Sequence, residues 1–236
     1  MKKLVATLCL SALATAAFAQ GTVIIANGTG TLFKTNSTAL SGGTSGNASA
    51  YNASGVNFHY EVLTAPSTVT TVDSSLQGLL SAPWSDTGAG GTNTTFASGG
   101  RVNGPSGSQG TVNNWPGTPA PGQSFIVVGW STDEGANWTQ FSAALLGAHF
   151  NSAGYWDQGN PLLHNGGFIG ASTIQAAQSG APDGTGAFSL FGSVGGSQGT
   201  PITTPTTMFV VNVPEPTSFA LLGLGTAAML IFRRRK

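Results

Sequence analysis

Residues 124–130 read Ser-Phe-Ile-Val-Val-Gly-Trp, and this uncharged run is the part of the sequence that decides the fold. Successive side chains of a β-strand point to opposite faces of a sheet, so the consecutive apolar residues at positions 125–128 would make both faces apolar. The central strand of a sheet that is packed on both sides has this pattern. We therefore predict that residues 124–130 form a central, buried strand.

Residues 56–63 show a different strand pattern. Apolar residues stand at positions 56, 58, 60 and 62, and polar residues stand at positions 57, 59 and 61. A period of two predicts a strand with one buried face and one solvated face. Further strands are predicted at residues 22–26, 69–72, 168–174, 187–191 and 207–213, and a short helix is predicted at residues 141–146.

The spacing of these segments indicates the fold class. Short apolar runs are separated by Gly, Ser, Thr and Asn rather than repeated at the period of a helix, and the chain holds 35 glycines in 236 residues. This glycine-rich pattern favours an all-β protein, with one β-sandwich or jelly-roll-like domain over residues 20–212. Residues 41–54 and 88–110 are rich in Gly, Ser, Asn and Thr and are expected to be long surface loops.

The first 19 residues have the layout of a secretory signal peptide. Lysines at positions 2 and 3 precede an apolar run over residues 4–18, and Ala17-Phe18-Ala19 stands directly before Gln20. A cationic start, an apolar run and a small-x-small site are the three parts of such a signal. A buried N-terminal helix would explain the apolar run but not Ala17 and Ala19, so we expect cleavage after Ala19.

A second apolar segment lies near the other end of the sequence. Residues 217–232 contain no charge, and they are followed by Arg233, Arg234, Arg235 and Lys236. A helix over these residues would be about 24 Å long, which spans a bilayer core of about 30 Å if the arginine side chains reach toward the headgroups. The basic cluster favours the cytoplasmic side, which places the body of the protein outside the inner membrane, in the periplasm.

Pro214, Glu215 and Pro216 stand immediately before this segment. Pro-Glu-Pro, a short apolar helix that contains glycine and an arginine cluster follow one another over residues 213–236, and this order resembles the PEP-CTERM sorting signal. The resemblance implies that an exosortase, a membrane-embedded cysteine protease or transpeptidase, processes the tail. It also implies delivery to the cell envelope, the cell surface or an exopolysaccharide matrix such as that of a biofilm.

The residues of this motif are compatible with a processing site. The two prolines hold the segment extended and stop the membrane helix from continuing outward, which leaves the segment accessible at the membrane surface. Glu215 would serve either as a recognition group or simply as an interfacial carboxylate. The alternative for the whole tail is a permanent single-pass anchor.

Between the two ends the sequence is poor in charge. Residues 20–213 contain two cations, Lys34 and Arg101, against seven carboxylates, which gives a net charge of −5. Binding of nucleic acid through phosphates requires clustered Lys and Arg, so we exclude it. The single cysteine, Cys9, lies in the predicted signal peptide, so the mature protein would have no thiol, no disulfide and no cysteine ligand for zinc.

We predict no catalytic, metal or cofactor site in the body. The histidines at positions 59, 149 and 164 lack the spacing that places two imidazoles on one helix face. Asp133 and Glu134 are adjacent, so their side chains point apart in an extended segment and make a poor acid and base pair. No serine is predicted in a Gly-x-Ser-x-Gly elbow between a strand and a helix. An enzyme therefore ranks last, although buried, coupled carboxylates in a cleft would favour one.

The five tryptophans are the remaining candidates for ligand contacts. Trp84 and Trp115 lie in loop-like sequence, so their rings are candidate carbohydrate contacts, whereas core packing is the alternative for all five. The sequence thus predicts a non-enzymatic exported protein with a structural or interaction role in the envelope or matrix. A carbohydrate-binding module of the cell surface is the alternative.

Overall fold

The computed structural model describes residues 20–36, 58–93, 100–102, 104, 109–113, 122–157, 160–179, 186–192 and 199–212. The strands are β1 (Gln20–Ile24), β2 (Phe33–Thr35), β3 (Phe58–Pro66), β4 (Ser85–Thr92), β5 (Gln109–Asn113), β6 (Gln123–Ser131), β7 (His149–Phe150), β8 (Trp156–Asp157), β9 (Phe168–Ala171), β10 (Gln175–Ala177), β11 (Phe188–Ser189) and β12 (Thr206–Asn212). The helical elements are the 3-10 turns η1 (Thr29–Thr31), η2 (Gln77–Leu80) and η4 (Thr132–Glu134) and the α-helix α2 (Trp138–Leu145). The predicted all-β class is confirmed.

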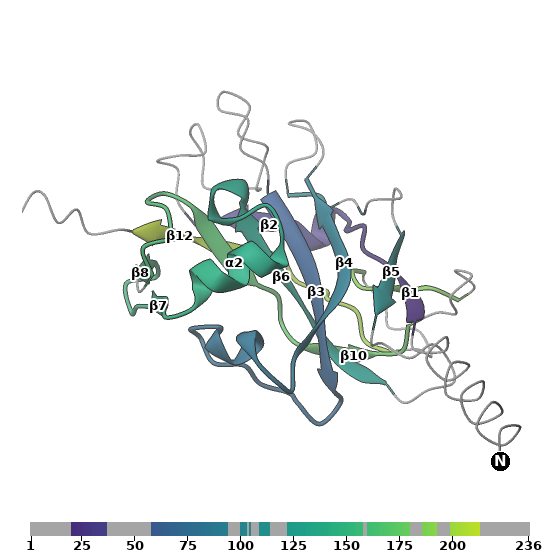
Figure 1. Ribbon diagram of the computed structural model, residues 1–236. Coiled ribbons are helices and arrows are strands. Elements are labelled where there is room, and N and C mark those ends of the chain that lie inside the picture. The colour runs from purple at the N-terminus through teal and green to yellow at the C-terminus, as the bar shows by residue number, and fades with distance from the viewer. Residues whose placement is uncertain are drawn as a thin grey trace, which may run out of the picture.

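The strands form a large mixed sheet and a small three-stranded sheet (Figure 1). The order of the large sheet is β4-β3-β6-β9-β12-β8-β7, with β10 paired to β6 and β2 paired to β12, and the order of the small sheet is β11-β1-β5. β12 pairs in parallel with both β2 and β8, whereas a jelly roll is antiparallel. The predicted sandwich or jelly-roll arrangement is therefore not confirmed.

β6 is the central strand that the sequence predicts. Phe125 and Val127 point into one hydrophobic core, and neither is exposed. Ile126, Val128 and Trp130 point into a second core on the opposite face and are at most 1% exposed. Both faces of the strand are therefore buried, as the uninterrupted apolar run indicates.

Each core joins β6 to a different layer of the molecule. In the first core the large sheet packs against the small sheet through residues such as Val23 of β1 and Phe188 of β11. In the second core the large sheet packs against α2 and η2 through residues such as Phe141 and Leu79. Figure 1 shows α2 in front of the large sheet, with β1 and β5 of the small sheet on the right of the view.

β3 departs from the predicted pattern on its second face. Phe58 is fully buried in the first core, as expected, but Leu63 and Ala65 are buried in the second core, so this face is not solvated. Only His59 and Glu61 on that face are half-buried. The reason is that α2 and η2 cover the face, and a local period of two cannot reveal a cover that comes from distant sequence.

Two further predictions need correction, and two segments lie outside the described ranges. Residues 69–72 form no strand, since Val69 and Val72 pack against the second core without joining a ladder. Residues 88–110 are not one surface loop, because β4 and β5 take up both ends and Val102 is 1% exposed. Residues 41–54 and residues 56–57 are not among those that the structure describes.

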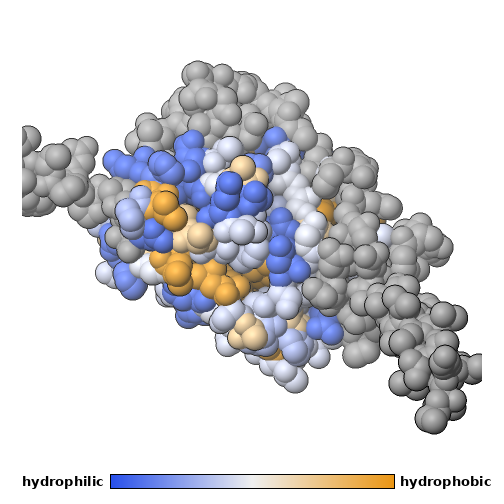
Figure 2. Space-filling model, viewed as in Figure 1, coloured by the Kyte–Doolittle hydropathy of each residue, from blue (hydrophilic) through white to orange (hydrophobic). Residues whose placement is uncertain are grey.

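The predicted short helix is present as α2 and begins three residues earlier than expected. The side chain of Asn137 accepts a hydrogen bond from the backbone N–H of Gln140 at 3.0 Å, and this cap fixes the start of the helix. Among the described residues no helix is both long and apolar enough to cross a membrane. The predicted membrane helix over residues 217–232 lies outside those ranges. Figure 2 shows a largely polar visible surface with an apolar area beside α2.

A substitution at Gly170 tests how closely β9 approaches β12. A Cβ atom at this position would lie 2.5 Å from the carbonyl oxygen of Thr207 and 2.8 Å from the Cα of Met208, so the two strands would have to move apart. We expect Gly170→Ala to lower the free energy of unfolding by about 1–3 kcal/mol. Gly30→Ala is the control, because no heavy atom lies within 4 Å of its added Cβ. Equal urea midpoints for the two variants would contradict this packing.

Candidate functional site

The structure describes one of the two tryptophans that we predicted as carbohydrate contacts. Trp84 is 7% exposed and packs in the second core with Leu76 and Leu79, so its ring follows the alternative of core packing and is not an exposed carbohydrate contact. A burial of this kind leaves no open ring face for a sugar. Trp115 lies outside the described ranges, as do the other predicted site residues, namely Ala17, Ala19, Pro214, Glu215, Pro216, Arg233, Arg234, Arg235 and Lys236.

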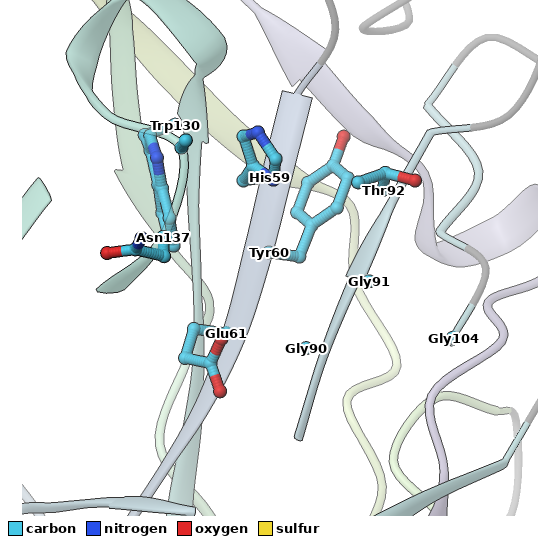
Figure 3. Close-up of a pocket in the computed structure, with 10 residues that line it drawn as sticks. His59, Tyr60, Glu61, Gly90, Gly91, Thr92, Gly104, Trp130 and Asn137 are labelled. Atoms are coloured by element: carbon cyan, nitrogen blue, oxygen red, sulfur yellow. The ribbon is translucent and has the colours of Figure 1, made fainter. Parts of the chain in front are cut away.

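A groove beside β3 lies next to several titratable side chains. Its volume is about 470 Å³. It is lined by His59, Tyr60, Glu61, Gly90, Gly91, Thr92, Gly104, Trp130, Ala136 and Asn137. Figure 3 shows Trp130 and Asn137 on one side of β3 and the glycines of β4 on the other. The glycines leave this side without side chains, which keeps the groove open.

Trp130 supports the wall of this groove rather than offering a flat binding surface. One face of its indole stacks on Phe141, with ring centroids 4.4 Å apart and an angle of 5° between the rings. His59 stacks on the ring as well, with centroids 5.8 Å apart and an angle of 26°. The indole N–H donates to the carbonyl of Gly135 at 2.8 Å. The ring is 1% exposed, so its apolar surface and its donor are both in use.

Glu61 is an ionisable side chain of the groove whose pKa is strongly raised. Its carboxyl lies against Gly90, where an added Cβ atom would come within 2.6 Å of Oε2. Burial, the negative charge of Asp86 and a hydrogen bond with Asp86 raise the pKa of Glu61 to about 9. Glu61 thus keeps its proton at pH 7, and its buried Oε1 has no hydrogen-bond partner in the part of the chain that the structure describes.

His59 is also neutral in the groove. Burial lowers the pKa of its imidazole from the usual value of 6.5. The Oδ1 of the nearby Asn137 accepts the capping hydrogen bond of α2, so this amide is partly used by the fold. The groove therefore presents uncharged hydrogen-bonding groups, which suit a neutral polar ligand better than an ion.

Glu134 is a second carboxyl with a raised pKa, and sequence reasoning missed it. The side chain is 2% exposed, although it follows the exposed Asp133 in a turn. Both of its oxygens accept from the backbone N–H of His164 at 3.2 Å, and Gly167 leaves the space that the carboxyl fills. Burial raises the pKa of Glu134 to about 8, against the lowering effect of the His164 hydrogen bond. Glu134 joins η4 to the segment before β9.

The expectation of no metal site in the body stays a prediction. Within the described ranges no three His, Cys, Asp or Glu side chains come together in a way that could hold an ion. His59 lies in β3, and His149 is the first residue of β7. The Nδ1 of His164 lies 3.9 Å from the Oε2 of Glu134.

The comparison with known proteins concerns the segment that follows β12. Residues 212–236 match the model of the PEP-CTERM protein-sorting motif. The chain carries a PEP-CTERM sorting motif. The match begins at Asn212, the last residue of β12, so the sorting motif starts where the last described strand ends. Comparison with curated proteins and with solved structures gives no match.

The PEP-CTERM motif indicates how the protein is exported and processed. It implies an exported protein that is anchored at the membrane before an exosortase processes it. The motif covers residues 212–236 and does not extend into the folded body, so it says nothing of what the delivered domain does. The groove and the surface are the features that bear on that role.

Because the pKa values of Glu61 and Glu134 are raised, we predict that stability falls as pH rises. Glu61 and Glu134 keep their protons in the folded state up to about pH 9 and about pH 8, whereas an unfolded chain releases them near pH 4.5. Between these values the folded state binds more protons, so the free energy of unfolding falls by up to about 1.4 kcal/mol per pH unit for each group. Urea unfolding at pH 5 and pH 8 measures this difference.

Glu61→Gln and Glu134→Gln remove the titrating proton while keeping the size of the side chain. Each variant is expected to reduce the loss of stability between pH 5 and pH 8, and the double variant to remove most of it. Asp133→Asn, at an exposed position beside Glu134, is the control: it removes only the smallest of the three effects on the pKa of Glu134, so most of the pH dependence should stay in place. A native protein that is equally stable at both pH values would show that neither carboxyl is held protonated.

Proposed function

We propose that this protein is a non-enzymatic component of the cell envelope or exopolysaccharide matrix. A signal peptide over residues 1–19 exports it, the PEP-CTERM tail holds it in the inner membrane with its body in the periplasm, and an exosortase releases it to the cell surface or matrix. The observation that carries the proposal is the sorting motif, which follows directly on the last strand of the folded body.

The body of the protein supports a structural or interaction role. Its net charge of −5 over residues 20–213 disfavours binding of nucleic acid and of other polyanions. The groove beside β3 presents neutral groups, since Glu61 is protonated and the pKa of His59 is lowered. A weakly charged, glycine-rich β domain suits contact with neutral polymers or with other matrix proteins.

The Glu61 and Asp86 pair is the feature that most favours an enzyme. Two hydrogen-bonded carboxyls beside a groove resemble an acid and base pair, and a raised pKa is common among catalytic acids. Against this, the Oε1 of Glu61 is inaccessible to solvent, and its proton is already engaged by Asp86. We therefore assign the pair to the packing of β3 against β4.

The carbohydrate-binding alternative now depends on Trp115 and the groove, because the ring of Trp84 is buried. A glycan array on the mature protein tests it. Binding that is lost in Trp115→Ala would favour the alternative, and binding that survives would remove this ring from it. Trp84→Ala is not informative here, because truncating a buried tryptophan damages the core.

Replacement of Pro214, Glu215 and Pro216 by alanine tests the sorting proposal in the native host. Alanines would allow the apolar helix to extend outward and would remove the recognition carboxylate. We expect the variant to accumulate in the membrane fraction with its tail attached, while the native protein leaves that fraction. Thr68→Ala and Thr70→Ala, at exposed positions in the body, are the control. Release of the motif variant at the native rate would contradict the proposal.

A further inference from the structure

One end of the folded body gathers segments that are distant in the sequence. β8 pairs with the last residues of β12, with Val211 opposite Trp156 and Asn212 opposite Asp157. β7 pairs with β8 and follows the C-terminal end of α2. Figure 1 shows β7, β8 and the end of β12 on the same side of the molecule. The chain therefore leaves the described body from this end, at Asn212.

The large apolar side chains that stay exposed in the described ranges belong to the same end. Leu146, at the C-terminus of α2, is 61% exposed, and Leu162 is 54% exposed. The amide of Asn160 donates to the carbonyl of Ala143 at 2.6 Å, which ties the turn that contains Leu162 to α2. The backbone N–H of Gly166 donates to the carbonyl of Val211 at 2.8 Å, which ties the same segment to β12.

This end also borders a hollow and carries little charge. Phe150, Trp156 and Phe209 line the hollow, whose volume is about 250 Å³, together with polar residues that include Asp73 and Ser172. In Figure 2 apolar residues are visible beside and below α2, toward β7. Residues 138–167 contain no lysine or arginine and a single carboxylate, Asp157. Such a surface fits an uncharged, partly apolar partner.

The length of the connection limits how far this end can be from the membrane. Four residues, 213–216, separate Asn212 from the apolar segment at residues 217–232. Even fully extended, this connection spans at most about 18 Å. The headgroup layer on each side of a bilayer is about 6 Å thick. While the tail is anchored, the end that carries Leu146 and Leu162 therefore stays close to the headgroups.

We propose that this end of the body docks on the lipid headgroup region before processing, with Leu146 and Leu162 as its contacts. The inference rests on the proposed function, since it requires the tail to be in the membrane. The short connection keeps the local concentration of lipid high, so two leucines suffice to orient a body that they could not recruit alone. Because the end lacks cations, docking does not need anionic lipid.

Collisional quenching measures this orientation in the unprocessed chain, which lacks the signal peptide and keeps the sorting tail. The chain from Gln20 to Lys236 lacks Cys9, so a single fluorophore can be attached at Ser152→Cys, in the turn between β7 and β8. Ser67→Cys, directly after β3, gives a matched exposed position away from this end. The chain is reconstituted in phosphatidylcholine vesicles that contain a lipid with a nitroxide on its headgroup.

We expect quenching at position 152 to exceed quenching at position 67 at least about twofold, since the bilayer contacts only one end of the body. Leu146→Ser with Leu162→Ser should remove this difference, and Leu146→Met with Leu162→Met should keep it, because methionine preserves an apolar contact. Both leucines are exposed, so neither pair should change the urea midpoint of the protein.

The outcomes separate this inference from the function on which it rests. A chain that does not float with the vesicles would overturn membrane anchorage, and docking with it. A chain that floats but is quenched equally at both positions would overturn docking alone. Equal quenching together with loss of processing of the serine pair in the native host would assign this end to the exosortase instead of lipid.

Discussion

The pairing of β3 with β6 is the interaction on which the rest of the structure depends. The two strands are antiparallel along their whole length, from Phe58 opposite Ser131 to Pro66 opposite Gln123. Their side chains enter both hydrophobic cores, so this one ladder holds the small sheet on one face and α2 on the other. The protein keeps no charge within residues 123–131, because an ion there would be buried without a partner.

This arrangement connects the folded body to its sorting tail. β9 joins β6 to β12, and β12 ends at the residue where the PEP-CTERM motif begins. The end of the strand is fixed by β8 and by the segment before β9, through the hydrogen bonds between Val211 and residues 166–167. The motif therefore starts from a fixed point on a folded domain.

The sequence predicted the parts of the fold that depend on local patterns. The apolar run at 124–130 identified the central strand, and the position of α2 followed from residues 141–146. Prediction from the sequence failed where burial depends on contacts between distant segments. Leu63 of β3 and Trp84 are examples, since both enter the second core. Likewise, nothing near Glu134 indicated that His164 and Gly167 would enclose its carboxyl. The sorting motif was predictable because its order of residues is read without a fold.

The central claim is that an exosortase-sorted tail delivers an intact folded domain outside the cell. Mass spectrometry of both termini of the native protein, recovered from the membrane and extracellular fractions of its host, tests this most directly. We predict an extracellular form that begins at Gln20 and ends near Pro214, Glu215 and Pro216, with the strands through Asn212 complete. A protein found only in the membrane, with Arg233 to Lys236 still attached, would contradict it and make the tail a permanent anchor.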